Sequence, residues 1–216
     1  MYYPYVRQIT QPKRRVMTVI GIGNQSVAPD IANIQLEVST ENMELTQAQQ
    51  ENATIMSQVI QALLNLGINR EDIKTASYNI IPQYDYIEGR QVFRGYQVIN
   101  AITVKITNIE QVGNVIDVAV QNGANRVSNI QFTVDKEELE YQKALSLALQ
   151  NALVKAQTIA NTMQLQLDPT PIKIVEEFRE APIPYQRFAA VETAASTPIE
   201  PGQITINATV NVQFQY

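Results

Sequence analysis

Two long stretches in the middle of the chain constrain its fold most. Residues 74–87 and 92–107 are rich in β-branched and aromatic side chains, and Glu88-Gly89-Arg90 separates them as a turn. At about 3.3 Å per residue, a strand of roughly 13 residues is about 43 Å long, which is twice the usual strand length. The chain therefore predicts a β-hairpin that projects beyond the body of its domain.

The segments around this hairpin predict a ferredoxin-like core. Residues 31–40 alternate apolar and polar side chains as a half-buried strand does, and residues 44–66 carry apolar side chains at the helical period. A capped helix over 108–123 and a strand over 126–134 follow the hairpin. The order strand–helix–strand–strand–helix–strand is that of a split βαβ unit. We therefore expect an α+β fold with a largely antiparallel sheet.

Further elements are added to this core. A strand over 16–23 precedes it, a long third helix over 136–167 follows it, and two C-terminal strands end the chain near 171–178 and 204–215. The inner stripe of the long helix is predicted to hold Leu145, Ala148, Leu149, Ala152, Ala156, Ile159, Ala160 and Met163. So much alanine predicts a close approach to the packing partner. We expect one domain over 16–216, preceded by a flexible tail over 1–15.

Gly21-Ile22-Gly23 is not the phosphate loop of a dinucleotide-binding enzyme. The third glycine of that motif is missing, and the next segment reads as a strand instead of a helix whose N-terminus could face a phosphate. Two glycines in a strand more often permit a bulge or a close backbone approach. No cofactor is expected.

Composition excludes several kinds of chemistry. The chain has no histidine and no cysteine, which removes the commonest general base, thiolate nucleophiles and the usual zinc ligands. Its formal net charge is −5, so nucleic acid is not an expected partner. No apolar run is long enough for a transmembrane helix, and the first residues do not read as a secretion leader. The expected location is therefore the cytoplasm, with the cell envelope or surface as the alternative.

Aromatic residues concentrate on the predicted hairpin. Tyr78, Tyr84 and Tyr86 share one face of its first strand, and Phe93 and Tyr96 lie on the second. They either pack across the hairpin or contact another subunit, because tyrosine is favoured at interfaces. We select Tyr84, Tyr86 and Tyr96 as candidate interface residues. A proline-rich loop over 179–202 is the second choice, with Pro182 and Pro184 as its candidates.

The chain resembles the SIMPL-domain family, also called domain of unknown function 541. The resemblance covers about residues 16–216 and rests on four stretches in order: MTVIGIGNQSVAPDIANIQLEV, LGINREDIKTASYNIIPQYDY, GYQVINAITVKI and ALSLALQNALVKAQTIANTM. Family members include bacterial periplasmic proteins linked to oxidative-stress defence and an immunogenic protein of Brucella type. The resemblance implies an α+β fold, assembly of some members into large rings, and no established catalytic residue.

Three functional hypotheses follow. The preferred one is a non-enzymatic scaffold that forms a homo-oligomer through the hairpin and the final strand, and the family resemblance implies a ring as its form. The alternative is a small-molecule or peptide binding module that uses the 179–202 loop. The third is an enzyme in which two of the carboxylates converge in one cleft, the candidates being Asp85, Glu88, Glu176, Glu177 and Glu180. Neither the protein partner nor the physiological process follows from the residues.

Overall fold

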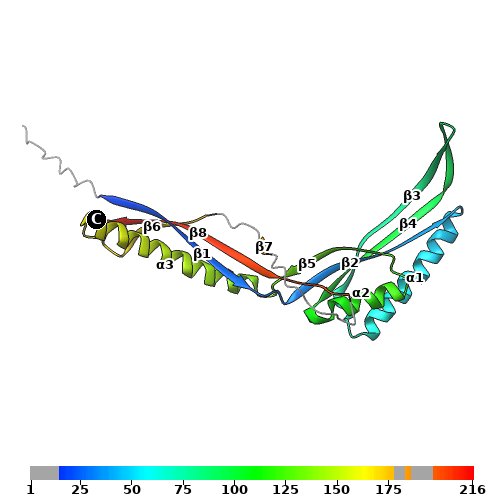
Figure 1. The fold of residues 1–216 in the computed structure, drawn as a ribbon, viewed down its shortest axis with the longest axis horizontal. Coiled ribbons are helices and arrows are strands. Elements are labelled where there is room, and N and C mark those ends of the chain that lie inside the picture. Colours follow the sequence, from blue (N-terminus) through cyan, green and yellow to red (C-terminus); the bar gives the residue numbers. More distant parts are fainter. Residues whose placement is uncertain (1–14, 178–182, 186–196) are drawn as a thin grey trace, which may run out of the picture. The chain divides into compact units, whose positions relative to one another are not determined.

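The chain folds into two compact units and forms two four-stranded sheets (Figure 1). The computed structural model describes residues 15–177, 183–185 and 197–216. Unit 1 comprises Met1–Ser26, Glu138–Ile183 and Thr205–Tyr216, and unit 2 comprises Val27–Glu137 and Pro184–Ile204. The predicted tail over 1–15 lies outside the described residues except for Arg15.

The sheet of unit 2 is antiparallel in every pair. Its strand order is β3 (Ile73–Ile87), β4 (Arg90–Ile106), β2 (Ile31–Asn42) and β5 (Arg126–Thr133). The longest helix of this unit, α1 (Leu45–Asn65), lies along the sheet (Figure 1). The chain between strands also forms α2 (Val112–Gln121) and two short 3₁₀ helices, Arg70–Asp72 and Ile109–Gln111.

One face of this sheet packs on the helices. Alternate residues of β2 point to that face, because successive strand side chains point to opposite sides. The apolar core residues larger than alanine that are fully inaccessible to solvent in this unit are Ile34, Leu36, Val38, Val59, Leu63, Val98, Val104, Val112 and Val115. The other face is polar and carries Gln35, Glu37 and Ser39.

Unit 1 packs one long helix on its sheet. The strand order is β1 (Val16–Val27), β8 (Gln203–Gln215) and β6 (Pro171–Glu176), and the short β7 (Ile183–Tyr185) also pairs with β8. Strand β8 has the predicted alternation, with every second side chain buried. The helix is α3 (Glu137–Met163).

Glycine and alanine bring β1 and α3 into backbone contact. A Cβ atom built on Gly21 would lie 2.1 Å from the carbonyl oxygen of Ala148 and 2.8 Å from the Cβ of Ala152. Neither separation leaves room for a side chain. The close backbone approach predicted for the Gly21-Ile22-Gly23 stretch is therefore confirmed, and the helix backbone is what approaches.

The stripe on α3 is narrower than predicted. Its buried residues are Tyr141, Ala144, Ala148, Ala152, Ala156 and Ala160. The larger predicted members Leu149, Ile159 and Met163 are exposed, so that part of the prediction is wrong. The physical reason is the short helix–strand distance, which leaves room only for methyl groups at the contact.

The predicted α+β class is confirmed, and so is the order of elements across residues 31–134. The ferredoxin-like description of this core stays a prediction. Two details differ from expectation. The strands form two sheets instead of one, and the C-terminal part holds three strands, because the three-residue β7 lies inside the predicted loop. A strand so short gives no periodic signal in the sequence.

Candidate functional site: the β3–β4 arm

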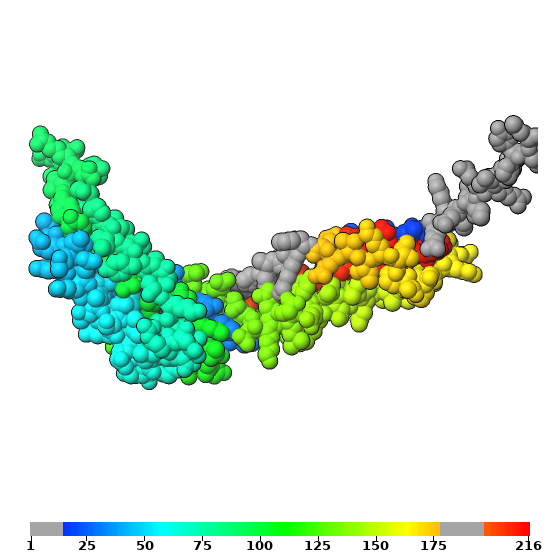
Figure 2. All heavy atoms as spheres, turned by 180° about the vertical axis from the view of Figure 1, so that it is seen from behind, coloured from blue at the N-terminus to red at the C-terminus, as the bar shows by residue number. Residues whose placement is uncertain are grey.

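The hairpin of β3 and β4 extends past the strand that supports it. The last register pair between β2 and β4 joins Asn42 to Tyr96. Towards the tip, residues 83–95 pair only with each other among the described residues, from Gln83 opposite Gly95 to Ile87 opposite Arg90. We call residues 83–95 the arm. It stands clear of the rest of unit 2 in the space-filling view (Figure 2).

The turn at the tip is set by two residues with positive φ. Glu88 has φ 50° and Gly89 has φ 76°. Positive φ at both central positions is the signature of a two-residue type I′ turn, whose twist matches that of the flanking strands. The prediction of a turn at Glu88-Gly89-Arg90 is thus confirmed, with Arg90 already in β4.

The base of the arm is fixed by a glycine. The pairing register shifts between Gln83 and Tyr84, which is a β-bulge. Gly95 lies beside this bulge with φ 148°, and a Cβ atom there would lie 2.8 Å from the carbonyl oxygen of Asn42. Because Gly95 has no side chain, the segment that connects β2 to α1 can pass directly against β4. Pro82 precedes the bulge on β3, and proline is tolerated there because β3 is an edge strand of the sheet.

Aromatic rings pack along one side of the arm. The ring centroids of Tyr84 and Phe93 are 5.6 Å apart, and those of Phe93 and Tyr96 are 5.1 Å apart, both edge-to-face. Such pairs stabilise a two-stranded ribbon by about 0.5–1.5 kcal/mol each beyond their buried area. Tyr96 is half-buried at the base, whereas Tyr84 is 45% exposed and Tyr86 is 76% exposed.

The arm therefore presents apolar side chains to solvent. Its exposed large residues are Tyr84, Tyr86, Ile87, Val92 and Phe93, followed towards the base by Tyr78, Ile80 and Ile81. The register places Tyr84, Tyr86 and Phe93 on one face of the ribbon and Ile87 and Val92 on the other, so both faces carry exposed apolar groups. Sequence reasoning selected the tyrosines but not Ile87 and Val92. Their nearness to the predicted turn was visible in the sequence, whereas the end of the supporting strand β2 at Asn42 was not.

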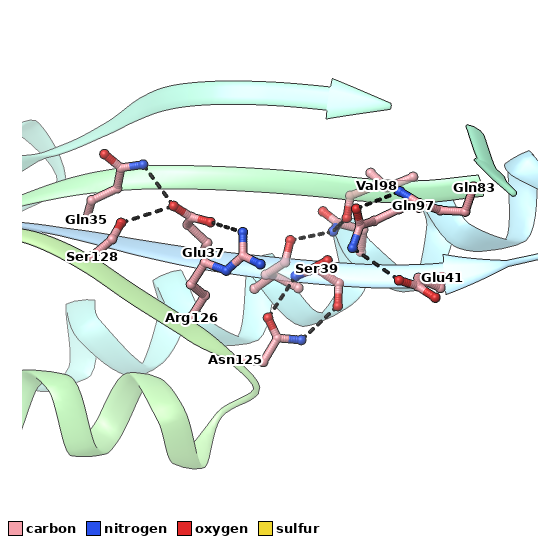
Figure 3. A network of polar contacts seen from close by, with 12 residues as sticks. Gln35, Glu37, Ser39, Glu41, Gln83, Gln97, Val98, Asn125, Arg126 and Ser128 are labelled. Carbon is pink, nitrogen blue, oxygen red and sulfur yellow. Dashed lines mark hydrogen bonds and ion pairs between the residues drawn. The ribbon is translucent and has the colours of Figure 1, made fainter. Parts of the chain in front are cut away.

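A polar network surrounds the base of the arm (Figure 3). Arg94 forms an ion pair with Glu41, and its second terminal nitrogen lies 3.8 Å from Asp85. Gln97 donates from Nε2 to Glu41 Oε1 at 3.1 Å and accepts at Oε1 from Gln83 Nε2 at 3.0 Å. These side chains are largely exposed, so the ion pairs orient the arm more than they stabilise it.

A shallow cavity of about 390 Å³ opens at this point. It is lined by Glu41, Asn42, Met43, Gln83, Arg94, Gly95 and Tyr96. A volume of this size could take a small polar molecule. However, its charged groups already pair with each other, and nothing in the geometry selects a ligand.

A second polar cluster lies further along the same sheet face (Figure 3). Glu37 is only 8% exposed, and its carboxylate accepts from Gln35 Nε2 at 3.0 Å and Ser128 Oγ at 3.1 Å. Arg126 lies 3.5 Å from the same carboxylate. Asn125 accepts at Oδ1 from the backbone N–H of Ser39 and donates from Nδ2 to the backbone carbonyl of Ser39. This cluster connects β2 to the segment of β5, so we interpret its polar groups as structural.

Three of the carboxylates named in the third hypothesis have other partners in the described residues. Asp85 faces Arg94. Glu176 accepts from the Tyr141 hydroxyl at 2.5 Å, and Glu177 accepts from the Asn211 amide. Within the described ranges no group of His, Cys, Asp or Glu side chains is arranged to hold a metal ion. Glu180 lies outside those ranges.

The loop candidates can be followed only in part. Pro182 lies outside the described residues, and Pro184 lies in β7, where the backbone alone is described. Both stay predictions, as does the ligand-binding alternative for the 179–202 loop. Across the described residues, none of the helices combines the length and the hydropathy that a bilayer crossing needs.

Several known bacterial proteins are similar to this chain along most of its length. The "26 kDa periplasmic immunogenic protein" of Brucella melitensis is 28% identical over 220 residues, covering 95% of this chain and 86% of the relative. The protein of the same name from Brucella abortus has the same identity and coverage. The "Uncharacterized protein YggE" of Escherichia coli is 25% identical over 198 residues, covering 90% of this chain and 80% of the relative.

The periplasmic names correct the expected location. The cytoplasmic prediction was wrong, since the Brucella relatives point to the periplasm. That prediction rested on missing features, and the absence of cysteine is compatible with either compartment.

A family model supports the same relationship along nearly the whole chain. It matches residues 17–214, which include the glycine stretch of β1, the arm, the alanine stripe of α3 and β8. Its description is SIMPL, protein of unknown function, DUF541. The chain belongs to the SIMPL (DUF541) family.

Proposed function

We propose that this chain is the subunit of a self-assembling scaffold and that the arm is its docking element. The observation that carries the proposal is the exposure of Tyr86, Ile87 and Val92 on a ribbon that pairs only with itself among the described residues. A two-stranded ribbon alone is marginally stable in water. Contact with another subunit around the tip removes these side chains, which lie on both faces of the ribbon, from solvent and holds the ribbon in place.

The names of the relatives support an envelope setting. Two relatives are named as periplasmic, and none of the relatives described above is named for an enzymatic activity. We therefore place the scaffold in the periplasm and assign it no catalytic step. A stress-related role is part of the proposal through the family resemblance alone. Survival of a strain without the gene during oxidant exposure, with and without restoration of the gene, tests it.

The assembly proposal is tested by absolute mass in solution. Light scattering after size exclusion is measured on the full chain and on a variant with Tyr86→Thr, Ile87→Thr and Val92→Thr. Threonine keeps the β-propensity of the arm while removing apolar surface. We expect a mass several times the 24.2 kDa of one chain for the unchanged protein, and a shift to the single-chain mass for the variant.

A matched control removes equally exposed apolar residues elsewhere. Leu139, Val154 and Met163 are 48–64% exposed on α3, and their replacement by glutamine keeps the helix-forming tendency. This control should keep the mass of the unchanged protein. An unchanged protein that is monomeric at micromolar concentration, or an arm variant that keeps the full mass, contradicts the proposal.

A further inference from the structure

Strand β1 is an edge strand with no charged residue of its own. It runs for 12 residues as VMTVIGIGNQSV and pairs only with β8 in the described part of the chain. Val16, Ile20 and Ile22 are 41–51% exposed on the face away from α3. An edge that is long, apolar and uncharged is a template for pairing with another strand, and proteins usually protect such edges.

Here the protection comes from the neighbouring helix. Asn151 Oδ1 accepts from the backbone N–H of Ile22 at 3.1 Å. Lys155 donates from Nζ to the backbone carbonyl of Ile20 at 2.8 Å. The two helix residues are four positions apart, so they lie on one flank of α3. Together they form a clasp on the edge of β1.

The clasp copies the hydrogen bonds of an added strand. In a parallel ladder, one residue of the new strand donates to the carbonyl before the facing residue and accepts from the N–H after it. The carbonyl of Ile20 and the N–H of Ile22 are those two groups around Gly21. Lys155 and Asn151 therefore stand where one residue of an incoming strand would bind, and either strand direction has to displace them.

The contact between glycine and alanine makes this reach possible. Because Gly21 carries no side chain, the backbone of α3 lies against β1 at Ala148. Asn151 and Lys155, about one and two turns further along the helix, can then reach around the edge of the strand. The clasp thus depends on the same residues that pack unit 1.

We propose that the edge of β1 is a strand-addition site, that the clasp of Asn151 and Lys155 holds it closed, and that its occupant is β1 of a second copy. Two β1 edges meeting about a two-fold axis place identical apolar rows side by side. With no charge from Val16 to Val27, the two copies do not repel each other along the strand. This contact is separate from the arm and does not depend on the proposed scaffold function.

The test uses the natural absence of cysteine. The chain contains none, so single substitutions Thr18→Cys, Ile20→Cys and Ile22→Cys report β1–β1 contact through disulfide dimers under mild oxidation. Each is made in the full chain with the clasp intact and with Asn151→Ala plus Lys155→Met. Every chain also carries the three arm substitutions, so that association through the arm does not contribute.

Opening the clasp is expected to raise disulfide dimers about tenfold at equal chain concentration, the order of effect of removing competition from two net hydrogen bonds. Lys155→Arg, which keeps the donor, should behave as the intact chain. The matched control is Lys143→Met plus Asn161→Ala on the same helix. Ile174→Cys on β6 controls for cross-linking by collision.

Equal dimer yields with the clasp intact and open overturn the proposal, as does an equal rise in the Lys143 and Asn161 control. Circular dichroism establishes whether each chain is folded. If the double clasp variant does not fold, Lys155→Met alone serves, with a smaller rise in dimers expected and no rise overturning the proposal. Failure here leaves the arm experiment unaffected, because the latter is read in chains with an intact clasp.

Discussion

At the scale of single residues, Gly23 shows how little space β1 and α3 leave between them. A Cβ atom there would lie 2.0 Å from the carbonyl oxygen of Ala144 and 2.5 Å from the N of Ala148. Both are backbone atoms, so the helix itself has to move. We expect Gly23→Ala to lower the free energy of unfolding by about 3 kcal/mol, as overpacking of a rigid contact does. Urea unfolding followed by circular dichroism measures it.

Gly67 provides the control for this substitution. It has φ 97° and no atom within 4 Å of a built Cβ, so Gly67→Ala meets conformational strain without a clash. That strain should cost roughly 1–2 kcal/mol. If Gly23→Ala costs no more than Gly67→Ala, the contact between strand and helix is softer than the geometry indicates.

Asn52 is a buried polar residue whose amide joins two strands. It is fully inaccessible to solvent, and Nδ2 donates to the carbonyls of Val38 at 2.8 Å and Val98 at 3.0 Å. Its Oδ1 has no partner among the described residues. Asn52→Asp places a carboxyl oxygen against two carbonyls, and we expect a loss of about 3 kcal/mol or more at pH 7, measured by urea unfolding.

The effect of Asn52→Asp should depend on pH. Burial raises the pKa of a carboxyl group, because the charged form is disfavoured. An acid with a raised folded pKa loses stability as the pH rises above its unfolded value of about 3.9. The variant should therefore approach the unchanged protein towards pH 4, whereas Asn52→Ala should show a deficit that does not vary with pH. A constant deficit for Asn52→Asp would mean that residue 52 reaches water.

At the scale of elements, α2 anchors the chain where it returns from the 186–196 segment. The backbone N–H of Thr197 donates to Asp117 Oδ2 at 3.1 Å, and its hydroxyl donates to Oδ1 at 2.5 Å. These hydrogen bonds lower the pKa of Asp117 below its ordinary value. Ile199, two residues further on, packs against the core of unit 2.

A lowered acid pKa fixes the direction of the pH effect on this anchor. The anchor is fully present above the ordinary aspartate pKa and is lost as the pH falls through the lowered folded value. The amide resonance of Thr197, followed by NMR from pH 6 to pH 2, should shift as Asp117 takes up its proton. In Asp117→Asn the same resonance should not move over this range, and a flat profile in the unchanged protein contradicts the anchor.

The elements differ in how much of them the sequence could predict. Strand β8 alternates so regularly that its buried face could be read directly, and the turn at Glu88-Gly89 fixed the hairpin. On α3, the helical period predicted that Leu149 and Ile159 are buried, but both are exposed. The helix residues that lie closest to Gly21 and Gly23 of β1 include Ala144, Ala148 and Ala152. Which residue faces a glycine is a long-range fact, and periodicity within one element does not contain it.

The candidate site could also be predicted only in part. The sequence shows the tyrosines of the hairpin, because they alternate along strands that are longer than usual. The point at which support ends was not predictable, since it depends on β2 stopping at Asn42 opposite Tyr96. The pairing of Arg94 with Glu41 joins residues 53 positions apart, and the sequence gives no local sign of it.

At the scale of the whole molecule, the chain connects its two units four times, after residues 26, 137, 183 and 204. Unit 1 is built from segments near the start, in the middle and at the end of the chain, and unit 2 is inserted between them in sequence. We propose that residues 16–216 nevertheless unfold as one domain. Gly21→Ala, which perturbs unit 1, should then weaken unit 2 equally. A loss of about 2.8 kcal/mol would speed amide hydrogen exchange roughly a hundredfold in both units.

The measurement compares two sets of buried strand amides. Leu36 and Val38 report on unit 2, and Val210 and Val212 report on unit 1. Asn52→Ala supplies the reciprocal perturbation and should accelerate exchange at Val210 and Val212 by the same factor as at Leu36. Equal acceleration in both directions requires one cooperative transition, because local opening of a unit leaves the other protected. If Gly21→Ala exposes Val210 while Leu36 keeps its protection, the chain unfolds as two domains and the single-domain proposal fails.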